Sequence, residues 1–419
     1  MDSDELDWKF GQVFGDKTPV EDVADVDIVS AVEFDQSGDF LAAGDRGGRV
    51  VLFEREKEKE KGTHFKFYCE FQSHEPEFDY LKSLEIEEKI NKIRWFPQQW
   101  AQSHLLLTTN DKTIKLWKVS EQKVREVDRE VDSGLSIPKV IDEKTQLFST
   151  PKKVFANAHA YHINSVSLNC DGETFLSADD LRVNFWNLDN SVQSFNVVDI
   201  KPPNMEELTE VITAAEFHPR HCNLMMYSTS KGTIKLNDLR ENALCDTTGV
   251  AFEVAEDPDG KSFFSEIISS VSDIKFINNG DLILSRDYLT LKIWDIKMNE
   301  KPLQTISIHD YLLPKLCDLY ENDCIFDKFE CTASPDGKHV VSGSYQNYFN
   351  IYNRESGSGT SIEALKAIRT AKKVSTREHE HINPDNLDYN KKCLHVCWNP
   401  KMDVVALAAS NNLYLYNAL

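Results

Sequence analysis

Histidine, cysteine and acidic side chains are the groups in this 419-residue chain that could bind a metal ion or act in nucleophilic catalysis. The histidines to consider lie at expected strand starts or in turns, and they are His159, His162, His218 and His395. At such positions a structural hydrogen bond to a turn aspartate, such as Asp180, explains a histidine better than a ligand set does. The histidine pattern therefore favours a structural role over a metal centre.

The nine cysteines do not have the spacing of a zinc site. Cys317, Cys324 and Cys331 are too far apart for a zinc knuckle, and Cys393 with Cys397 lacks a His or Cys pair to complete four ligands. Scattered cysteines in odd number are typical of reduced, mostly buried thiols in a cytosolic or nuclear protein. We therefore expect no bound metal, and a cytoplasmic and nuclear location.

Residues 44–48 have a weak similarity to an enzyme motif. The run Gly-Asp-Arg-Gly-Gly contains the Gly-Asp and Asp-Arg-Gly elements of metallophosphatases. Those enzymes need further Asn-His and His motifs to hold two metal ions, and the chain does not contain them. A glycine-rich turn explains the run. Since there is also no nucleophile–base signature and no phosphate-binding loop leading into a helix, the sequence predicts a non-catalytic binding protein without a cofactor.

A repeated hairpin is the element that must position any functional residue. In residues 109–117 the Asn110-Asp111 turn precedes a strand of alternating apolar residues that ends at Trp117. The unit occurs seven times, each copy preceded by a further strand with its own turn. The terminal positions of the seven copies are Phe53, Trp117, Trp186, Asn237, Trp294, Tyr352 and Tyr416. This repeat predicts an all-β fold, a seven-bladed β-propeller of the WD-repeat type that forms one domain over residues 1–419.

The N-terminal segment and the charge of the chain add two expectations. Trp8 to Phe14 alternates, so we expect residues 1–14 to supply the outer strand that closes the last blade. The formal net charge of −22 argues against nucleic-acid or anionic-membrane binding and favours basic partners. The acidic N-terminus lacks the basic and apolar regions of a signal peptide, and no apolar stretch has the length of a membrane span.

Long connections between blades are the expected carriers of function. Residues 201–212, 262–272 and 309–328 join outer to inner strands and should emerge on the face that holds the turns of Asp111 and Asp180. The acidic residues of this rim are Glu206, Glu207, Glu210, Glu266, Asp310, Glu321, Asp323 and Asp327, and Leu208, Val211, Phe263, Phe264 and Tyr320 lie among them. Acidic and exposed apolar side chains on one face predict a peptide-binding surface.

Three further segments exceed a minimal blade. Residues 54–61 are a mixed-charge run that we interpret as a solvated loop, and residues 125–148 are predicted to be a polar loop. Residues 75–90 place Phe78, Tyr80, Leu84 and Ile86 at alternating positions. This pattern fits a hairpin that projects with its apolar side exposed, and it equally fits a hairpin folded flat on its own blade.

Several runs outside the generic repeat resemble the WD-repeat B-type regulatory subunit family of protein phosphatase 2A. They are residues 71–86, 176–182, 201–212 and 320–329, and the similarity extends from Trp8 to Tyr416. The resemblance implies a targeting subunit of a Ser/Thr phosphatase heterotrimer. It also implies two partner chains, a HEAT-repeat scaffold (A) subunit and a catalytic (C) subunit, and phosphoprotein substrates with basic residues near the phosphosite.

The resemblance assigns two sets of residues. The substrate groove would contain Asp180, Leu208, Val211, Tyr320, Asp323, Phe326 and Lys328, to which we add Phe263 and Phe264 of the rim. The projecting hairpin, residues 75–90, would rest on the scaffold subunit through Phe78, Tyr80, Leu84 and Ile86, with Glu85 and Glu87 at its margin.

The chain departs from the family pattern in residues 54–67, 121–148 and 355–383, so partners specific to its source stay open. The competing interpretation is a WD-repeat substrate receptor or scaffold of another assembly, such as a ubiquitin ligase. A cullin-adaptor docking segment would favour it, and we find none in the sequence.

Overall fold

A computed structural model describes residues 6–15, 22–56, 63–80, 83–97, 103–128, 139–246, 249–254, 262–364, 373–374 and 387–418. For residues 125–128, 139–144 and 373–374 only the backbone is described. The remainder of the variable segments 54–67, 121–148 and 355–383 lies outside these ranges. No helix in the described part of the chain is long and apolar enough to cross a bilayer.

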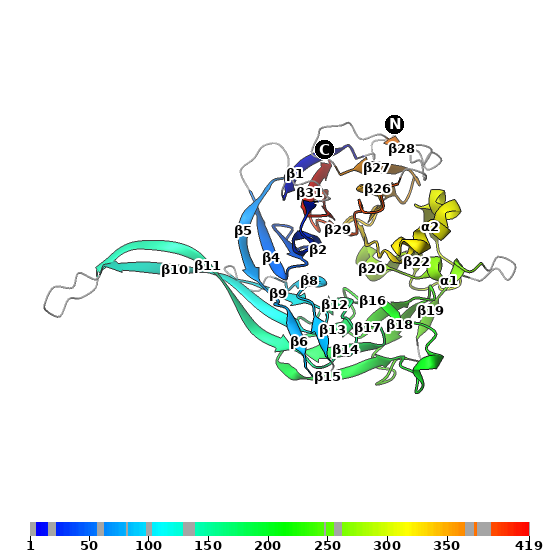
Figure 1. The fold of residues 1–419 in the computed structure, drawn as a ribbon, viewed down its shortest axis with the longest axis horizontal. Coiled ribbons are helices and arrows are strands. Elements are labelled where there is room, and N and C mark those ends of the chain that lie inside the picture. Colours follow the sequence, from blue (N-terminus) through cyan, green and yellow to red (C-terminus); the bar gives the residue numbers. More distant parts are fainter. Residues whose placement is uncertain are drawn as a thin grey trace.

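Seven antiparallel sheets are arranged around a central axis (Figure 1), which confirms the predicted seven-bladed propeller. Blade one consists of β2 (Val29–Phe34), β3 (Phe40–Asp45), β4 (Arg49–Arg55) and β5 (Phe65–Gln72). Blade two consists of β8 (Lys92–Trp95), β9 (Ser103–Thr109), β10 (Ile114–Asp128) and β11 (Lys139–Phe155). Blade three consists of β12 (Ser165–Leu168), β13 (Thr174–Ala178), β14 (Arg182–Asn187) and β15 (Asn190–Asp199).

Blade four consists of β16 (Ile212–Phe217), β17 (Leu224–Thr229), β18 (Ile234–Asp238) and β19 (Val250–Phe252). Blade five consists of β20 (Asp273–Ile277), β21 (Leu282–Arg286), β22 (Thr290–Asp295) and β23 (Gln304–Ser307). Blade six consists of β24 (Cys331–Ala333), β25 (His339–Gly343), β26 (Tyr348–Asn353), β27 (Gly359–Glu363) and β28 (Lys373–Val374). Blade seven combines β29 (His395–Trp398), β30 (Val404–Ala409) and β31 (Asn412–Ala418) with β1 (Trp8–Phe14). The short helices α1 (Ser265–Ser269) and α2 (Leu316–Glu321) lie in connections between blades.

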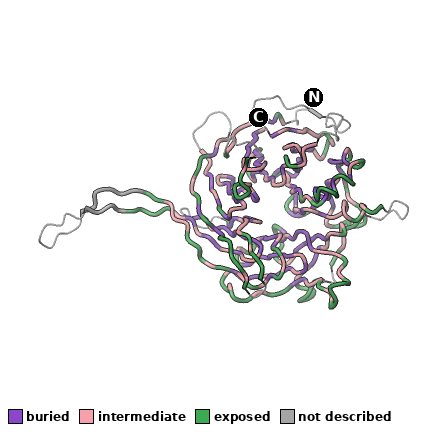
Figure 2. Tube along the Cα trace, viewed as in Figure 1, coloured by how far each residue is buried: buried purple, intermediate pink, exposed green. Residues whose placement is uncertain are grey.

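The hydrophobic cores lie between blades. Among the described residues, seven buried clusters each combine side chains of two neighbouring sheets, and together they go once around the ring. In the cluster between blades two and three, the rings of Phe155 and Trp186 have centroids 5.3 Å apart. Buried segments accordingly follow the blades, and exposed segments follow the outer edge (Figure 2). Each blade is therefore stable only with its neighbours.

The ring closes by pairing the two ends of the chain. β1 pairs antiparallel with β31, with Trp8 opposite Ala418. Trp8 is 5% exposed, and its ring packs edge-on against Trp398 with centroids 5.1 Å apart. The N-terminal strand thus contributes to the core between blades six and seven.

The glycine-rich run, residues 44–48, forms the turn between β3 and β4. Asp45 accepts a hydrogen bond from the backbone N–H of Arg49 (2.9 Å), and its carboxylate also pairs with the Arg49 guanidinium. Gly48 has φ +81°, and a Cβ there would lie 2.2 Å from the carbonyl oxygen of His74. The run is thus a turn in which glycine permits a close backbone approach.

A small separate sheet of β6 (Glu77–Asp79) and β7 (Leu84–Ile86) follows blade one. Phe78, Tyr80 and Leu84 are 49%, 84% and 52% exposed, so this hairpin is not packed flat on its blade. Its register pairs Phe78 with Glu85. Because cross-strand partners share a face, Leu84 and Ile86 lie on the face opposite to Phe78. The single apolar side expected from the sequence is wrong, since the turn sets the register.

The longest projecting element is instead the β10–β11 arm, a ribbon that extends from blade two well outside the ring (Figure 1). The two strands stay paired from Ile114 and Phe155 as far as Asp128 and Lys139. The polar loop predicted over residues 125–148 is therefore wrong for residues 125–128 and 139–148, which are strands, and residues 129–138 lie outside the described part of the chain. No Gly, Pro or Asn interrupts the chain between Trp117 and Asp128, where the described part of β10 ends, so the strand can continue past the blade.

Loss of the closing strand should destabilise the whole ring. Trp8→Ala should lower the free energy of unfolding by about 3–5 kcal/mol, because it leaves a cavity in a core shared by two blades. Thermal and denaturant unfolding of the purified chain measure this. Lys9→Ala, on the exposed side of the same strand, is the matched control and should unfold as the wild type does. A Trp8→Ala protein of unchanged stability would contradict this role of β1.

Candidate functional site

The turns between the second and third strands of each blade and the connections between blades meet on one face, which we call the turn face. Backbone hydrogen bonds join the two sets. The N–H of Ile212 donates to the carbonyl of Asp180 (2.7 Å), and that of Ile163 to the carbonyl of Asp111 (3.0 Å). Residues that are far apart in the sequence are thereby fixed on one rigid surface.

Asp179, and not Asp180, is the structural aspartate of blade three. Its carboxylate lies 2.9 Å from Nδ1 of His159 and accepts the N–H groups of Leu181 and Arg182 at 2.9 and 2.8 Å. Burial raises the pKa of Asp179, but the hydrogen bonds from His159 and the backbone outweigh it and hold the pKa below its usual value.

The network of Asp179 continues into the blade core. Nε2 of His159 lies 2.6 Å from Oγ of Ser177, and the indole N–H of Trp186 donates to the same oxygen at 2.9 Å. The hypothesis that a turn aspartate holds a histidine is correct for His159, but the partner is the residue before Asp180.

Asp180 instead lines a cavity of about 490 Å³ at the mouth of the central channel. Basic residues also line it, and they are Arg46, Lys89, Lys92, Lys328 and Lys392. Burial raises the pKa of Asp180, while the positive charge of Lys328 opposes this. The side chain of Asp180 accepts no hydrogen bond from the described residues, so it is available to a ligand.

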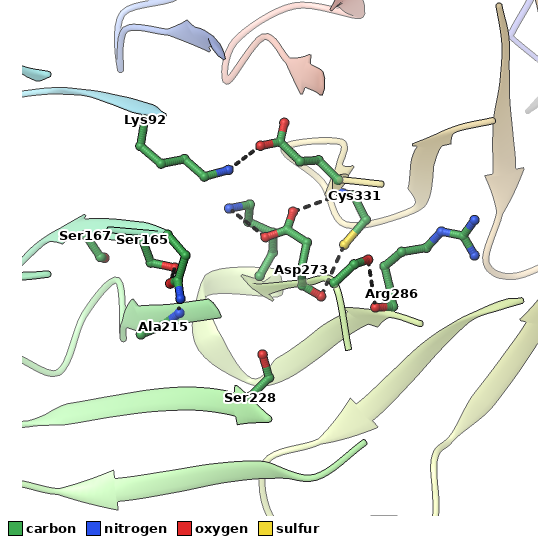
Figure 3. Close-up of polar contacts among 12 residues, drawn as sticks. Lys92, Ser165, Ser167, Ala215, Ser228, Asp273, Arg286 and Cys331 are labelled. Atoms are coloured by element: carbon green, nitrogen blue, oxygen red, sulfur yellow. Dashed lines mark hydrogen bonds and ion pairs between the residues drawn. The ribbon is translucent and has the colours of Figure 1, made fainter. Parts of the chain in front are cut away.

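Below this mouth the inner strands carry buried charges (Figure 3). Lys92 of β8 pairs with Glu330, and Asp273 of β20 pairs with Lys275 at 3.6 Å. Asp273 also accepts the backbone N–H of Cys331 at 3.0 Å. Burial raises the pKa of the Glu216 carboxyl to about 7. The Lys92–Glu330 and Asp273–Cys331 contacts join different blades, whereas the Asp273–Lys275 pair lies within β20.

Four predicted aromatic residues form a cluster on the connections after blades four and five. The ring of Phe263 lies 5.2 Å from that of Phe264 and 5.6 Å from that of Tyr320, between centroids. Tyr320, at the end of α2, lies 6.0 Å from Phe326. Phe263, Tyr320 and Phe326 are 71%, 41% and 53% exposed. A cluster of exposed aromatic rings on rigid elements is the typical centre of a protein interface.

A buried network that the sequence did not reveal supports this cluster. The hydroxyl of Tyr345 donates to the carbonyl of Cys324 (2.8 Å) and lies 2.9 Å from Oδ2 of Asp327, and Lys392 pairs with the same carboxylate at 2.5 Å. Tyr345 is 1% exposed although it sits in a turn. The sequence does carry a signal for this network, because Tyr345 is a large aromatic residue at a turn position where Asp or Asn is usual in the repeat.

Leu208 and Val211 lie in the connection after blade three. Leu208 ends the 3₁₀ helix η3 (Met205–Glu207), whose first turn is capped by the Asn204 side chain. Val211 donates its N–H to Oγ of Ser230 at 3.1 Å, and the next residue, Ile212, is fully buried. Both apolar side chains are half-buried, with the exposed Glu206 and Glu207 beside them.

The structure thus brings the predicted residues together in three groups. The aromatic group is Phe263, Phe264, Tyr320 and Phe326; the channel group is Asp180 and Lys328; and Leu208 and Val211 form the third. Asp323 is exposed between Tyr320 and Phe326 with φ +58°. The hairpin residues Phe78 and Tyr80 pack on each other, at 5.0 Å between ring centroids, and form a surface of their own.

No group of His, Cys, Asp and Glu side chains in the described part of the chain is arranged to hold a metal ion. The nine cysteines are free, and Cys245, Cys324, Cys331 and Cys393 are buried. The chemistry of the turn face, as far as the described residues form it, is that of recognition.

Comparison with known proteins gives one family match and two close relatives. Residues 149–187 match the family described as WD domain, G-beta repeat. The chain is 56% identical to the B-type regulatory subunit of protein phosphatase PP2A from Schizosaccharomyces pombe, with 99% of each chain covered. It is 52% identical to the serine/threonine-protein phosphatase 2A regulatory subunit phr2AB of Dictyostelium discoideum, with 99% of this chain and 98% of the relative covered.

The two adjacent aspartates should respond differently to substitution. Asp179→Ala should lower the free energy of unfolding by about 3 kcal/mol, because it removes one partner from a buried hydrogen-bond network. Asp180→Ala should change the free energy of unfolding by less than about 1 kcal/mol, because the Asp180 side chain accepts no hydrogen bond from the described residues. Urea unfolding of both variants measures the difference. Equal destabilisation by the two substitutions would contradict this assignment.

Proposed function

The chain belongs to the family of B-type regulatory subunits of protein phosphatase 2A, and from this premise we propose that its turn face recruits phosphoprotein substrates for the phosphatase. As a member of this family it is a non-catalytic regulatory subunit that acts in a phosphatase complex. The observation that carries the proposal is the exposed aromatic cluster, which lies beside acidic residues on the turn face.

The substrate class follows from the charges of this face. Glu206, Glu207 and Asp323 are exposed next to apolar side chains, and the net charge of the chain is −22. Such a surface attracts a segment with Lys or Arg residues and apolar anchors, and salt should weaken this attraction. We therefore propose that the substrates carry basic residues near their phosphosites.

The proposed partner chains are a HEAT-repeat scaffold (A) subunit and the catalytic (C) subunit. Two elements outside the seven blade sheets are candidates for the scaffold contact, and we propose the β6–β7 hairpin because it exposes the paired rings of Phe78 and Tyr80. The β10–β11 arm is the competing element. It is longer, and it leaves blade two at the end opposite to the turn face because β9 and β10 are antiparallel.

Substrate binding should depend on the channel and groove residues. Leu208→Ala should weaken the binding of a substrate segment by roughly 1–3 kcal/mol through lost burial. Asp180→Lys should also weaken this binding, because it reverses a charge. Added salt should weaken the binding of the wild-type chain in the same way. Fluorescence anisotropy with a labelled basic phosphopeptide from a substrate measures both. Val192→Ala, 92% exposed on the outer edge of blade three, is the control. Unchanged affinity in both groove variants would remove this surface from substrate binding.

The scaffold contact can be assigned with two variants. Phe78→Ala with Tyr80→Ala should weaken association with the scaffold subunit by about 2–4 kcal/mol, if these rings are the hot spots we propose. A second variant replaces residues 121–148 by a short turn and should retain scaffold binding. Pull-down of the scaffold subunit and melting curves of both proteins provide the measurement. The reverse outcome would assign scaffold docking to the β10–β11 arm, and the substrate proposal would be unaffected.

A further inference from the structure

Arg286, at the end of β21, is a fully buried arginine between blades five and six. Its side chain extends away from Asp273 and Cys331 (Figure 3). The guanidinium carbon lies 5.6 Å from the ring centroid of Phe329, and Nη2 lies 3.2 Å from Nδ1 of His309. The guanidinium is therefore surrounded by aromatic side chains in the protein interior.

Two nitrogens of this guanidinium have no hydrogen-bond acceptor among the described residues. They are Nε and Nη1, and both are buried. Nδ1 of His309 also lies 2.9 Å from the carbonyl oxygen of Tyr288. Since a carbonyl can only accept, this contact competes with Nη2 for Nδ1. Two nitrogens of Arg286, Nε and Nη1, thus lack an acceptor in the described part of the chain.

The positive charge of Arg286 also lacks a counter-ion among these residues. The neighbouring carboxylate, Asp287, accepts the N–H groups of Leu289 and Thr290 and pairs with Lys292. Partly buried cations of the ring differ in this respect. Arg94 pairs with Glu33 at 2.7 Å, Lys92 pairs with Glu330, and Lys275 pairs with Asp273.

Arginine cannot lose its proton in a protein, although burial lowers the pKa of Arg286. An unpaired buried charge is strongly destabilising, so a compensating group is required.

A second orphaned donor lies close by. The hydroxyl of Tyr352, on β26 of blade six, is buried and has no hydrogen-bond partner among the described residues. Tyr352 packs in the core between blades five and six, and Leu291, the cross-strand partner of Arg286, belongs to the same core. We propose that Arg286 and Tyr352 bind a small inorganic anion of the halide class, chloride in the cell, between blades five and six. Because both side chains are enclosed, the site excludes carboxylates and phosphate esters of other molecules.

The position of this anion links it to the turn face. His309 precedes the connection that carries Tyr320 and Phe326, and Phe329 follows it. Both rings pack on Tyr345, which holds that connection through Cys324 and Asp327. An anion at Arg286 would therefore stabilise the base of the aromatic cluster as well as the ring.

Chloride-dependent stability of the full chain tests the proposal. At constant ionic strength, replacement of gluconate by chloride should raise the melting temperature, and above the dissociation constant each tenfold increase in chloride should raise the folding equilibrium constant about tenfold. Arg286→Met should abolish the response and Tyr352→Phe should weaken it. Arg182→Met removes a surface ion pair with Asp199 and should respond as the wild type does.

Bromide provides a direct readout that does not depend on any variant. A crystal of the wild-type chain soaked in bromide should show an anomalous peak within hydrogen-bond distance of the Arg286 guanidinium. Absence of this peak, or a melting temperature independent of chloride, would overturn the proposal and assign these donors to water. A chloride response that persists in Arg286→Met would also overturn it.

Discussion

Burial of apolar side chains between neighbouring blades is the interaction on which the rest of the structure depends. Each of the seven cores combines two sheets, so no blade can bury its faces alone. Closure through Trp8 and Trp398 completes the last of these junctions. The connections add single apolar side chains to these cores, such as Ile90, Ile163 and Val271, and the rest of each connection lies outside them and can vary in length. Since the connections can vary in length, they can carry the additional residues that form the turn face.

The polar groups inside the ring are arranged by the same constraint. The inner strands meet at the channel, where apolar packing ends, and their charges are paired across blades, as Lys92 of blade two is with Glu330 of blade six. A buried charge is tolerated when its partner is fixed in place. The junction of blades five and six departs from this rule at Arg286, where aromatic rings replace a carboxylate.

The blades could be predicted from the sequence because each repeat carries its own turn and terminal aromatic residue. The sequence could not show which of two adjacent turn residues caps each blade. The capping residues Asn110, Asp179 and Asp287 all lie seven positions before Trp117, Trp186 and Trp294 (117 − 110, 186 − 179, 294 − 287), whereas the sequence pattern aligned Asp111 with Asp180. The β10–β11 arm and the β6–β7 register were missed because they depend on strand pairing and turn geometry. The aromatic cluster was anticipated only as residues of one rim, since contacts between connections depend on the closed ring.

Asp179 and Asp180 show how stability and recognition are separated within one turn. His159 and two backbone N–H groups hold Asp179 inside the blade. With that residue fixed, the next position must face the channel mouth, where burial raises the pKa of Asp180 and Lys328 opposes the rise. The turn that stabilises blade three therefore also determines where a carboxylate is presented. A binding residue placed in this way needs no flexible loop, and its position is as rigid as the ring.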